Sequence, residues 1–172
     1  MKAVHFLAIS LLSWQAKVGF SQVKERNDKY ALAWHIAREA GKPMLVVGGP
    51  YGTNPLRGLF NMKAHGCGDV CLDIEPRACT GCESVVADVR DIPFPDGFFK
   101  TALASHVIEH LPAIDDAVQA INELYRVADE VFIASPSKQS ILAWLIPSHH
   151  LWVRQDNEGI WLESWPGEKD DH

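Results

Sequence analysis

The sequence has no run of lysine or arginine side chains of the kind that follows a phosphate backbone. Its 16 Lys and Arg residues are outnumbered by 22 Asp and Glu residues, which gives a formal net charge of −6. We therefore expect no nucleic acid partner. Internal repeats and low-complexity stretches are also absent, and a length of 172 residues, 47% of them hydrophobic, suits one compact domain with its own core.

No apolar run reaches the roughly 20 residues that a membrane-spanning helix needs. The longest lies between Lys2 and Lys17, and its length is nearer to that of a signal-peptide core, but no small-residue cleavage site follows it directly. Three interpretations stay open for residues 1–21: a short uncleaved membrane anchor, an interfacial helix, or a segment packed on the domain surface. The rest divides into a domain at 22–165 and an acidic tail at 166–172 to which we assign no function.

Cysteine is scarce, but all four cysteines fall within 16 residues, in the pattern Cys-x3-Cys-x7-Cys-x2-Cys. They are Cys67, Cys71, Cys79 and Cys82. Four thiolates could close a structural zinc site, and the last two have a common ligand spacing. A disulfide between Cys79 and Cys82 is a further alternative, which export of the chain would favour. We favour ordinary buried thiols and assign no metal ligand.

Short apolar runs bounded by glycine, proline or polar residues predict buried strands. Five such runs lie at residues 44–47, 69–74, 85–87, 100–104 and 131–134. The first ends in a glycine-rich turn, which is where many cofactor sites begin.

Helical spacing of apolar residues predicts a helix over residues 22–40, closed by Gly41 and Pro43. Its expected apolar face is Leu32, Ile36 and Ala40. A later helix is expected to be capped by Asp115 or Asp116. Its expected apolar face is Val118, Ile121, Tyr125 and Ala128.

The last third of the chain predicts a short helix at 139–146 and a hairpin formed by 150–153 and 160–163. Before it, strands and helices alternate, which is typical of a mostly parallel sheet covered by helices on both faces. The predicted fold class is therefore α/β: a Rossmann-like three-layer sandwich whose mostly parallel sheet is followed by a C-terminal antiparallel hairpin.

The stretch VVADVRDIPFPDGFFKTALASHVIEHLP, at residues 85–112, carries the most specific pattern in the chain. An acidic residue, Asp88, is followed by Ile-Pro-Phe-Pro-Asp, a Phe-Phe pair, a strand, and the helix start Val-Ile-Glu-His-Leu at 107–111. This order resembles the class I S-adenosylmethionine-dependent methyltransferases, and specifically the small domains labelled type 11. The resemblance extends over about residues 44–136.

The resemblance implies that the chain binds S-adenosyl-L-methionine and transfers its methyl group to a small-molecule, lipid or protein acceptor. Ligands of open parallel sheets bind at the carboxyl ends of the strands, where the strand order switches. Asp73, about 25 positions after Gly48, has the spacing of a carboxylate that accepts hydrogen bonds from ribose hydroxyls. By resemblance, Asp88 and Val89 contact the adenine and Ser105 lies beside the methionine part.

The first glycine-rich turn departs from the Gly-x-Gly-x-Gly pattern of the family. Here Gly48 and Gly49 are followed by Pro50, Tyr51 and Gly52, so that proline stands where the family has its middle glycine. Proline fixes φ and removes an N–H donor, which changes the backbone shape offered to the cofactor. We still expect the three glycines to contact the cofactor.

Histidine titrates near neutral pH and can take a proton from a methyl acceptor. His106, which follows the fourth predicted strand, is the predicted catalytic residue. His110 is expected at the start of the next helix without a catalytic role. His149 and His150 are adjacent, and we expect them at the surface.

Two rival functions remain beside methyl transfer. One is a non-catalytic methyltransferase-like binding module, possibly tethered to a membrane through residues 1–21. The other is a membrane-tethered zinc module organised by the four cysteines. We expect the protein in the cytoplasm, or on a membrane facing the cytoplasm.

Overall fold

The computed structural model describes residues 2–49 and 66–165. A long first helix, α1 (Lys2–Ala40), precedes the strands β1 (Met44–Val47), β2 (Val70–Asp73), β3 (Ser84–Val86) and β4 (Phe99–Ser105). The 3-10 helix η2 (Ile108–His110), the helix α3 (Ile114–Val127) and β5 (Ala128–Ala134) follow. A short helix, α4 (Ile141–Trp144), and the strands β6 (Leu151–Asp156) and β7 (Gly159–Ser164) complete the described chain.

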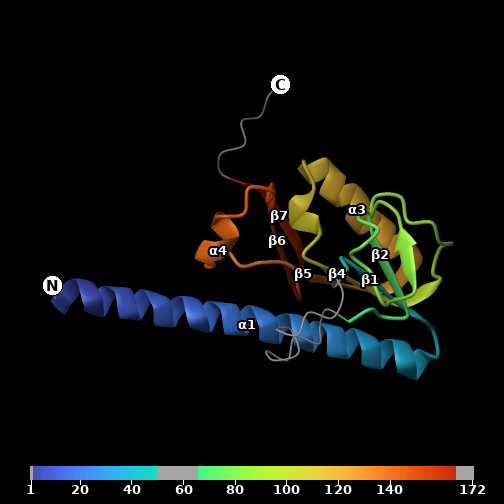
Figure 1. The fold of residues 1–172 in the computed structure, drawn as a ribbon. Coiled ribbons are helices and arrows are strands. Elements are labelled where there is room, and N and C mark those ends of the chain that lie inside the picture. Colours follow the sequence, from blue (N-terminus) through green and yellow to red (C-terminus); the bar gives the residue numbers. More distant parts are fainter. Residues whose placement is uncertain (1, 50–65, 166–172) are drawn as a thin grey trace.

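The first five strands form one parallel sheet in the order β3-β2-β1-β4-β5. From β1 the chain pairs outward through β2 and β3, and it then returns to the other side of β1 with β4. The switch of strand order therefore lies between β1 and β4. Helix α1 crosses one face of this sheet and α3 covers the other (Figure 1). The predicted three-layer α/β fold with a C-terminal hairpin is confirmed.

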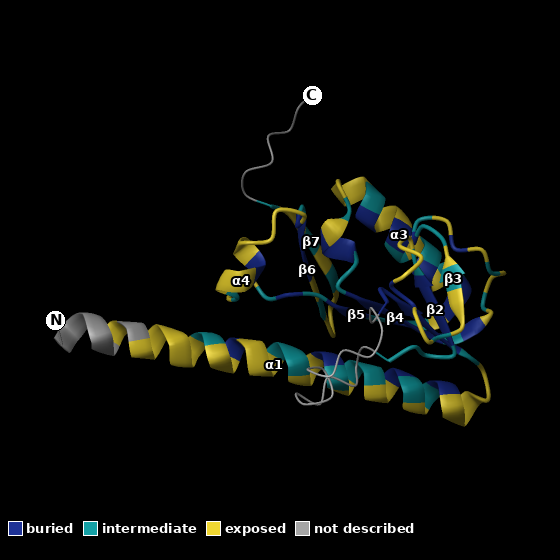
Figure 2. Cartoon of the chain, viewed as in Figure 1, coloured by how far each residue is buried: buried dark blue, intermediate teal, exposed yellow. Residues whose placement is uncertain are grey.

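Strand β4, in the interior of the sheet, is almost entirely buried (Figure 2). Alternation of side chains along the neighbouring β1 divides the core into two layers. Met44 and Val46 pack with Leu103 against α1. Leu45 and Val47 face the opposite side and belong to the larger cluster beneath α3. Because both faces of the sheet are covered, its strands read as continuous apolar runs, and that is why they could be located from the sequence.

Helix α1 is longer than expected and buries a different face. The predicted boundary between residues 21 and 22 lies inside a continuous helix, Lys2–Ala40. Its contact with the sheet is made by Ala33 and Ala37, which are fully buried, whereas Leu32 is 50% exposed. The predicted face of Leu32, Ile36 and Ala40 is therefore wrong. Alanine lets the helix backbone approach the sheet closely, and that favours burial of this face over the larger leucine side chain.

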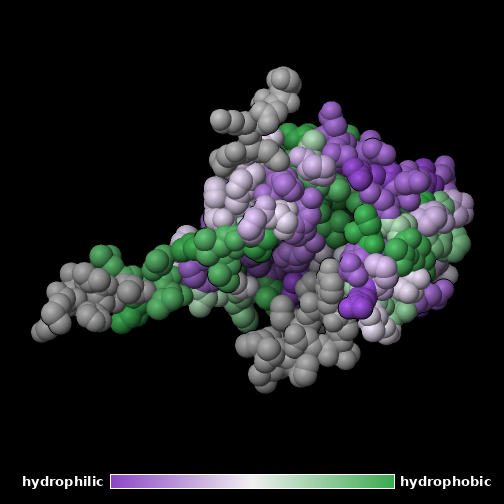
Figure 3. All heavy atoms as spheres, turned by 45° about the horizontal axis from the view of Figure 1, so that its top comes forward, coloured by the Kyte–Doolittle hydropathy of each residue, from purple (hydrophilic) through white to green (hydrophobic). Residues whose placement is uncertain are grey.

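The N-terminal half of α1 carries many exposed apolar side chains (Figure 3). They include Leu7, Ile9, Leu12 and Phe20. No helix among residues 2–49 and 66–165 combines the length and the apolarity that crossing a membrane requires. The segment does touch the rest of the domain, since the Gln15 side chain donates to the Gln139 carbonyl and accepts from the Ile141 N–H.

Helix α3 begins without the predicted aspartate cap. Ala113 is the N-cap residue and makes no side-chain capping bond, while Asp115 and Asp116 lie in the first turn, where their charges complement the helix dipole. The buried face is Ala117, Ala120, Leu124 and Val127. The predicted face is one position out of register, and Val118 and Tyr125 are exposed.

The antiparallel hairpin of β6 and β7 is confirmed, and the side chain of Gln155 links it to the parallel sheet by two hydrogen bonds. The Gln155 amide accepts a hydrogen bond from the Ile133 N–H and donates one to the Val131 carbonyl, both at 2.8 Å. These are backbone groups on the side of β5 away from β4. The hairpin is thereby positioned beside the edge of the sheet.

Candidate functional site

A cavity of about 620 Å³ opens at the carboxyl ends of β1, β2 and β4. This is the place where the strand order switches and where open parallel sheets bind ligands. Seven of the predicted site residues line it: Gly48, Gly49, Asp73, Asp88, Val89, Ser105 and His106. The eighth, Gly52, and Pro50 before it lie outside the described residues.

Gly48 and Gly49 form a wall that no side chain could occupy. Gly48 has φ +92°, and a Cβ there would collide with the carbonyl of Ser105. A Cβ on Gly49 would collide with the backbone of Ala78, in the loop after β2. The two glycines therefore let β1 approach β4 and the β2 loop closely, and they leave backbone rather than side chains facing the cavity.

Asp73, at the end of β2, connects its own loop with the glycine turn. One carboxylate oxygen accepts a hydrogen bond from the Gly49 N–H at 2.8 Å, and the other accepts from the Glu75 N–H at 2.9 Å. Each carboxylate oxygen has a second lone pair, so Asp73 can still accept hydrogen bonds from a ligand. It is partly exposed at the cavity wall.

Asp88 is engaged by Arg90, a cavity residue that the sequence reasoning missed. The Arg90 Nε and Nη2 donate to the Asp88 carboxylate at 3.0 and 2.6 Å, and its Nη1 donates to Asp116 at 2.5 Å. The hydrogen bond from Arg90 holds the pKa of Asp88 below its ordinary value. The sequence could have predicted this pair, because Arg90 follows Asp88 by two positions within the family-like stretch at residues 85–112.

His106 has a backbone and a side chain that are both tightly constrained. Its φ is +55°, a conformation uncommon outside glycine, and its N–H donates to the Ala134 carbonyl at 2.9 Å. The ring Nδ1 lies 3.2 Å from Oε1 of Glu109, and Nε2 lies 3.4 Å from Nη1 of Arg26. If Nδ1 carries the proton toward Glu109, Nε2 is the nitrogen left to accept one.

Glu109 and Arg26 are buried charged residues that the sequence did not identify as functional. Glu109 is 1% exposed, and its second oxygen, Oε2, accepts a hydrogen bond from Ser135 at 3.0 Å. Burial raises the pKa of Glu109, but His106, the charge of His110 and a backbone hydrogen bond together lower it more, and the pKa lies below its ordinary value. Arg26 is 5% exposed and comes from α1, far away in sequence, so that no local pattern could have assigned it.

His149 is buried, which corrects the expectation of a surface residue. It is 5% exposed, and its ring packs edge-on against that of His110 with centroids 4.8 Å apart. Burial lowers the pKa of the His149 imidazole and outweighs the opposing charge of Glu109. His149 thus belongs to a buried polar group next to the cavity.

We predict that acidification from pH 7.5 to 5.5 lowers the free energy of unfolding, in part through His149. The unfolded imidazole takes up a proton near its ordinary pKa of 6.5, whereas the buried one resists protonation, so the unfolded state binds more protons in this range. Urea unfolding at both pH values measures the effect. His149→Gln should reduce the difference between them, and His35→Gln, on the exposed surface of α1, should leave it unchanged. An equal difference in all three proteins would contradict the assignment.

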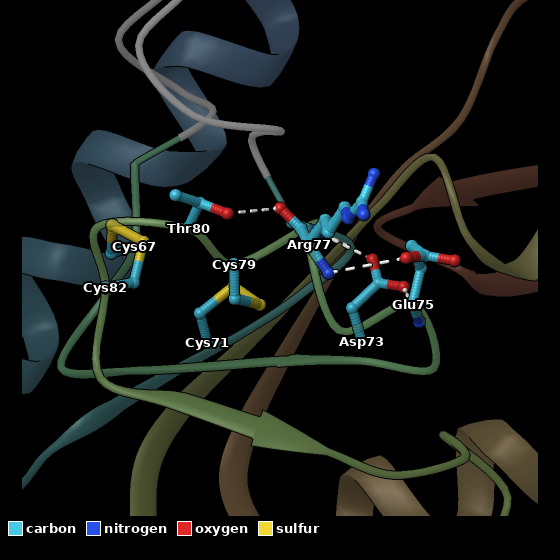
Figure 4. Close-up of a disulfide and its surroundings, with 9 residues drawn as sticks. Cys67, Cys71, Asp73, Glu75, Arg77, Cys79, Thr80 and Cys82 are labelled. Carbon is cyan, nitrogen blue, oxygen red and sulfur yellow. Dashed lines mark hydrogen bonds between the residues drawn. A yellow bond between two sulfur atoms is a disulfide. The ribbon is translucent and has the colours of Figure 1, made fainter.

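Two disulfides constrain the loop after β2 (Figure 4). Cys67 pairs with Cys82 and Cys71 with Cys79, with Cα atoms 5.4 and 5.7 Å apart. The favoured prediction of ordinary thiols is wrong, and so is the pairing of Cys79 with Cys82. Sulfurs bonded in this way are not available as thiolate ligands for zinc.

The disulfide pairing supports the cavity wall. Cys71 lies in β2, two residues before Asp73, and Cys79 follows Ala78, the residue against which Gly49 packs. Within the same loop, the Thr80 hydroxyl donates to the Arg77 carbonyl at 2.7 Å (Figure 4). The Cys71–Cys79 bond, the inner disulfide, therefore fastens this loop to the sheet. The same loop packs on the glycine turn.

Residues 57–130 match the family model described as a methyltransferase domain. No curated protein matches the chain. Among solved structures, the N-methyltransferase NodS from Bradyrhizobium japonicum with bound S-adenosylhomocysteine is 14% identical, with a TM-score of 0.40 over 59% of this chain and 56% of its own length. The PH0226 protein from Pyrococcus horikoshii is 19% identical, with a TM-score of 0.45 over 82% of this chain and 71% of its own.

A third solved structure, the trans-methyltransferase CalH in complex with S-adenosylhomocysteine, is 18% identical, with a TM-score of 0.42 over 68% of this chain and 39% of its own. The chain thus spans 56% of NodS and 39% of CalH. At these levels of similarity, what those proteins bind is a statement about them alone.

Proposed function

We propose that the chain is a class I methyltransferase that uses S-adenosyl-L-methionine to methylate a small-molecule, lipid or protein acceptor. One observation carries the proposal. One cavity is lined by residues that were predicted from three separate strand ends: Asp73, Asp88 and the pair Ser105-His106. Gly48 and Gly49 line the same cavity. The cavity volume of about 620 Å³ is in the range of cofactor sites.

The residues present fit such a cofactor in two further respects. Gly48 and Gly49 line the cavity without side chains, because a Cβ at either would collide with Ser105 or Ala78, and a surface of bare backbone suits close approach of a ligand. Ser105 is buried at the cavity wall, and its Oγ has no hydrogen-bond partner among the residues described. A ligand amine or carboxylate would supply that partner.

Asp73 would accept hydrogen bonds from the ribose hydroxyls, and Asp88 with Val89 would contact the adenine. The N–H, Nε and Nη2 of Arg90 all donate to Asp88, which fixes that carboxylate in one orientation at the cavity wall. Ser105 would hold the methionine part. The bound cofactor supplies the activated methyl group, and the remaining work of the protein is alignment and exclusion of water.

His106 would receive the proton that the acceptor loses. Oε1 of Glu109 lies 3.2 Å from Nδ1, and its negative charge favours a proton on that nitrogen, which leaves Nε2 as the acceptor. Arg26 lies 3.4 Å from Nε2, and a substrate hydroxyl or ammonium would have to take its place as the donor. Glu109 is therefore the positioning residue in this proposal.

Calorimetric titration with S-adenosylhomocysteine tests the cofactor assignment. We expect binding on the order of micromolar, against no measurable heat from ATP or NAD under the same conditions. Equal binding of all three nucleotides would favour a general nucleotide module, and no binding of S-adenosylhomocysteine would overturn the proposal.

His106→Asn should separate binding from transfer. Asparagine tolerates a positive φ, so the backbone at this position is maintained. We expect the rate of methyl transfer to fall by roughly 10²–10⁴-fold, which is the usual contribution of a general base to a rate. The affinity for S-adenosylhomocysteine should be unchanged. Incorporation of tritiated methyl groups into small-molecule, lipid and protein fractions measures it and identifies the acceptor class. Native protein that binds the cofactor but labels none of the fractions would favour the non-catalytic binding module.

The location of the protein stays a prediction: the cytoplasm, or a membrane surface facing it, reached through residues 1–21. In the reducing cytosol the two disulfides would open to four thiols, whereas an oxidising compartment would maintain them. Thiol trapping of the protein in its native cells distinguishes the two.

A further inference from the structure

Glu109, His110 and His149 bring three metal-ligating side chains to one point beside the cavity. One ligand atom from each lies within 4.8 Å of the other two. The residues come from η2 and from the loop before β6, which are tied together by a hydrogen bond from the His150 N–H to the Glu109 carbonyl at 2.8 Å. The separation is thus fixed by backbone contacts as well as by side chains.

Each of the two histidines has one ring nitrogen for which no hydrogen bond is found among the residues described. His110 Nδ1 lies 2.8 Å from the Ser148 carbonyl, and donation to that oxygen leaves Nε2 with its lone pair free for a ligand bond. His149 Nδ1 is buried without any hydrogen-bond partner among the residues described. A buried nitrogen in that state calls for a partner that the protein itself does not supply.

Glu109 adds a carboxylate with one oxygen still available. Oε2 accepts a hydrogen bond from Ser135, whereas Oε1 lies 3.2 Å from His106 Nδ1 without forming a well-aligned hydrogen bond. A carboxylate that is 1% exposed needs compensating positive charge. A cation at this point would supply that charge and the missing partner of His149 together.

We propose that Glu109, His110 and His149 bind one divalent transition-metal ion, with zinc as the best match. Two imidazoles and one carboxylate form the ligand set of many catalytic zinc sites, in which a fourth position stays open. Zinc-ligand bonds of about 2.1 Å place tetrahedral ligands roughly 3.4 Å apart. The ligand atoms, which lie within 4.8 Å of one another, therefore need to approach by up to about 1.4 Å.

The open position would be directed to the cofactor cavity, because His110 is also one of its lining residues. An acceptor with a hydroxyl or carboxylate oxygen could bind there. This last step rests on the proposed function, whereas the metal site itself does not.

Zinc titration of the full-length, tag-free protein tests the site, with its disulfides shown intact by the absence of thiol reaction. We expect one equivalent per chain with a dissociation constant on the order of micromolar or below. His110→Gln, at an exposed position, and His149→Gln should each weaken binding at least roughly tenfold, and His35→Gln should not. Bound cobalt should give the visible absorption of a tetrahedral site in the native protein only.

No saturable zinc binding by the folded native protein would overturn the proposal. So would binding that His110→Gln leaves unchanged, and this variant decides the question even if His149→Gln does not fold. Because the readout is metal alone, the result is independent of whether S-adenosylhomocysteine binds.

Discussion

Asp73→Ala is expected to bind S-adenosylhomocysteine roughly 100-fold more weakly than the native protein. In the proposed complex its carboxylate accepts two hydrogen bonds from the ribose, and each bond to a charged group contributes about 1.5 kcal/mol or more. Loss of about 3 kcal/mol corresponds to two powers of ten in the dissociation constant. The same carboxylate accepts the Gly49 N–H at 2.8 Å, so alanine also releases the glycine turn.

Two variants separate these contributions. Asp73→Asn has one acceptor oxygen and should lose less affinity than Asp73→Ala. Asp28→Ala removes an exposed carboxylate from α1 and should bind as the native protein does. Calorimetry measures all three, after circular dichroism has shown that each is folded. Affinity of Asp73→Ala within about threefold of native would rule Asp73 out as the ribose contact.

The Cys67→Ser, Cys82→Ser double variant is expected to lose about 3 kcal/mol in free energy of unfolding. The disulfide closes a loop of 15 residues, and such a loop removes about that much conformational freedom from the unfolded chain. Urea denaturation measures the loss. Thr80→Ala, which changes the same loop but leaves both disulfides in place, is the control. A loss below about 1 kcal/mol would mean that the closed loop is not what stabilises this region.

The inner disulfide should behave differently, because it fastens the loop that touches the glycine turn. Cys71→Ser with Cys79→Ser opens a shorter loop, for which the same model gives a slightly smaller loss of about 2.5 kcal/mol. Its effect on S-adenosylhomocysteine affinity should be the larger of the two, since Ala78 beside Cys79 packs against Gly49. Equal affinities for both double variants would show that the loop does not shape the site.

The sheet could be predicted from the sequence because each strand is an apolar run buried on both faces. The run at residues 44–47 coincides with β1, and its glycine end located the cavity. Helix faces were predicted less well. Ala33 and Ala37 carry little hydrophobic signal beside Leu32, yet small side chains are what the close contact with the sheet requires.

The candidate site was predictable where its residues lie at the ends of the predicted strands, as Gly48 and Asp73 do. Asp88 and His106 belong to a single family-like stretch and could be found there. Arg26 and His149 reach the same place from distant parts of the chain, and no spacing rule connects them with His106. The disulfides were missed for a related reason, since four cysteines allow three pairings and the fold alone selects one.

The Gln155 side chain has a consequence for how copies of this protein meet one another. By bonding to the Val131 carbonyl and the Ile133 N–H, its amide takes the place of a neighbouring strand along the outer edge of β5. The Lys29 ammonium donates to the Ile133 carbonyl at the same edge. An unprotected edge is a template on which another chain can add a strand and begin aggregation. Gln155, supplied by the hairpin, thus blocks the edge of β5 against the addition of a strand from another copy.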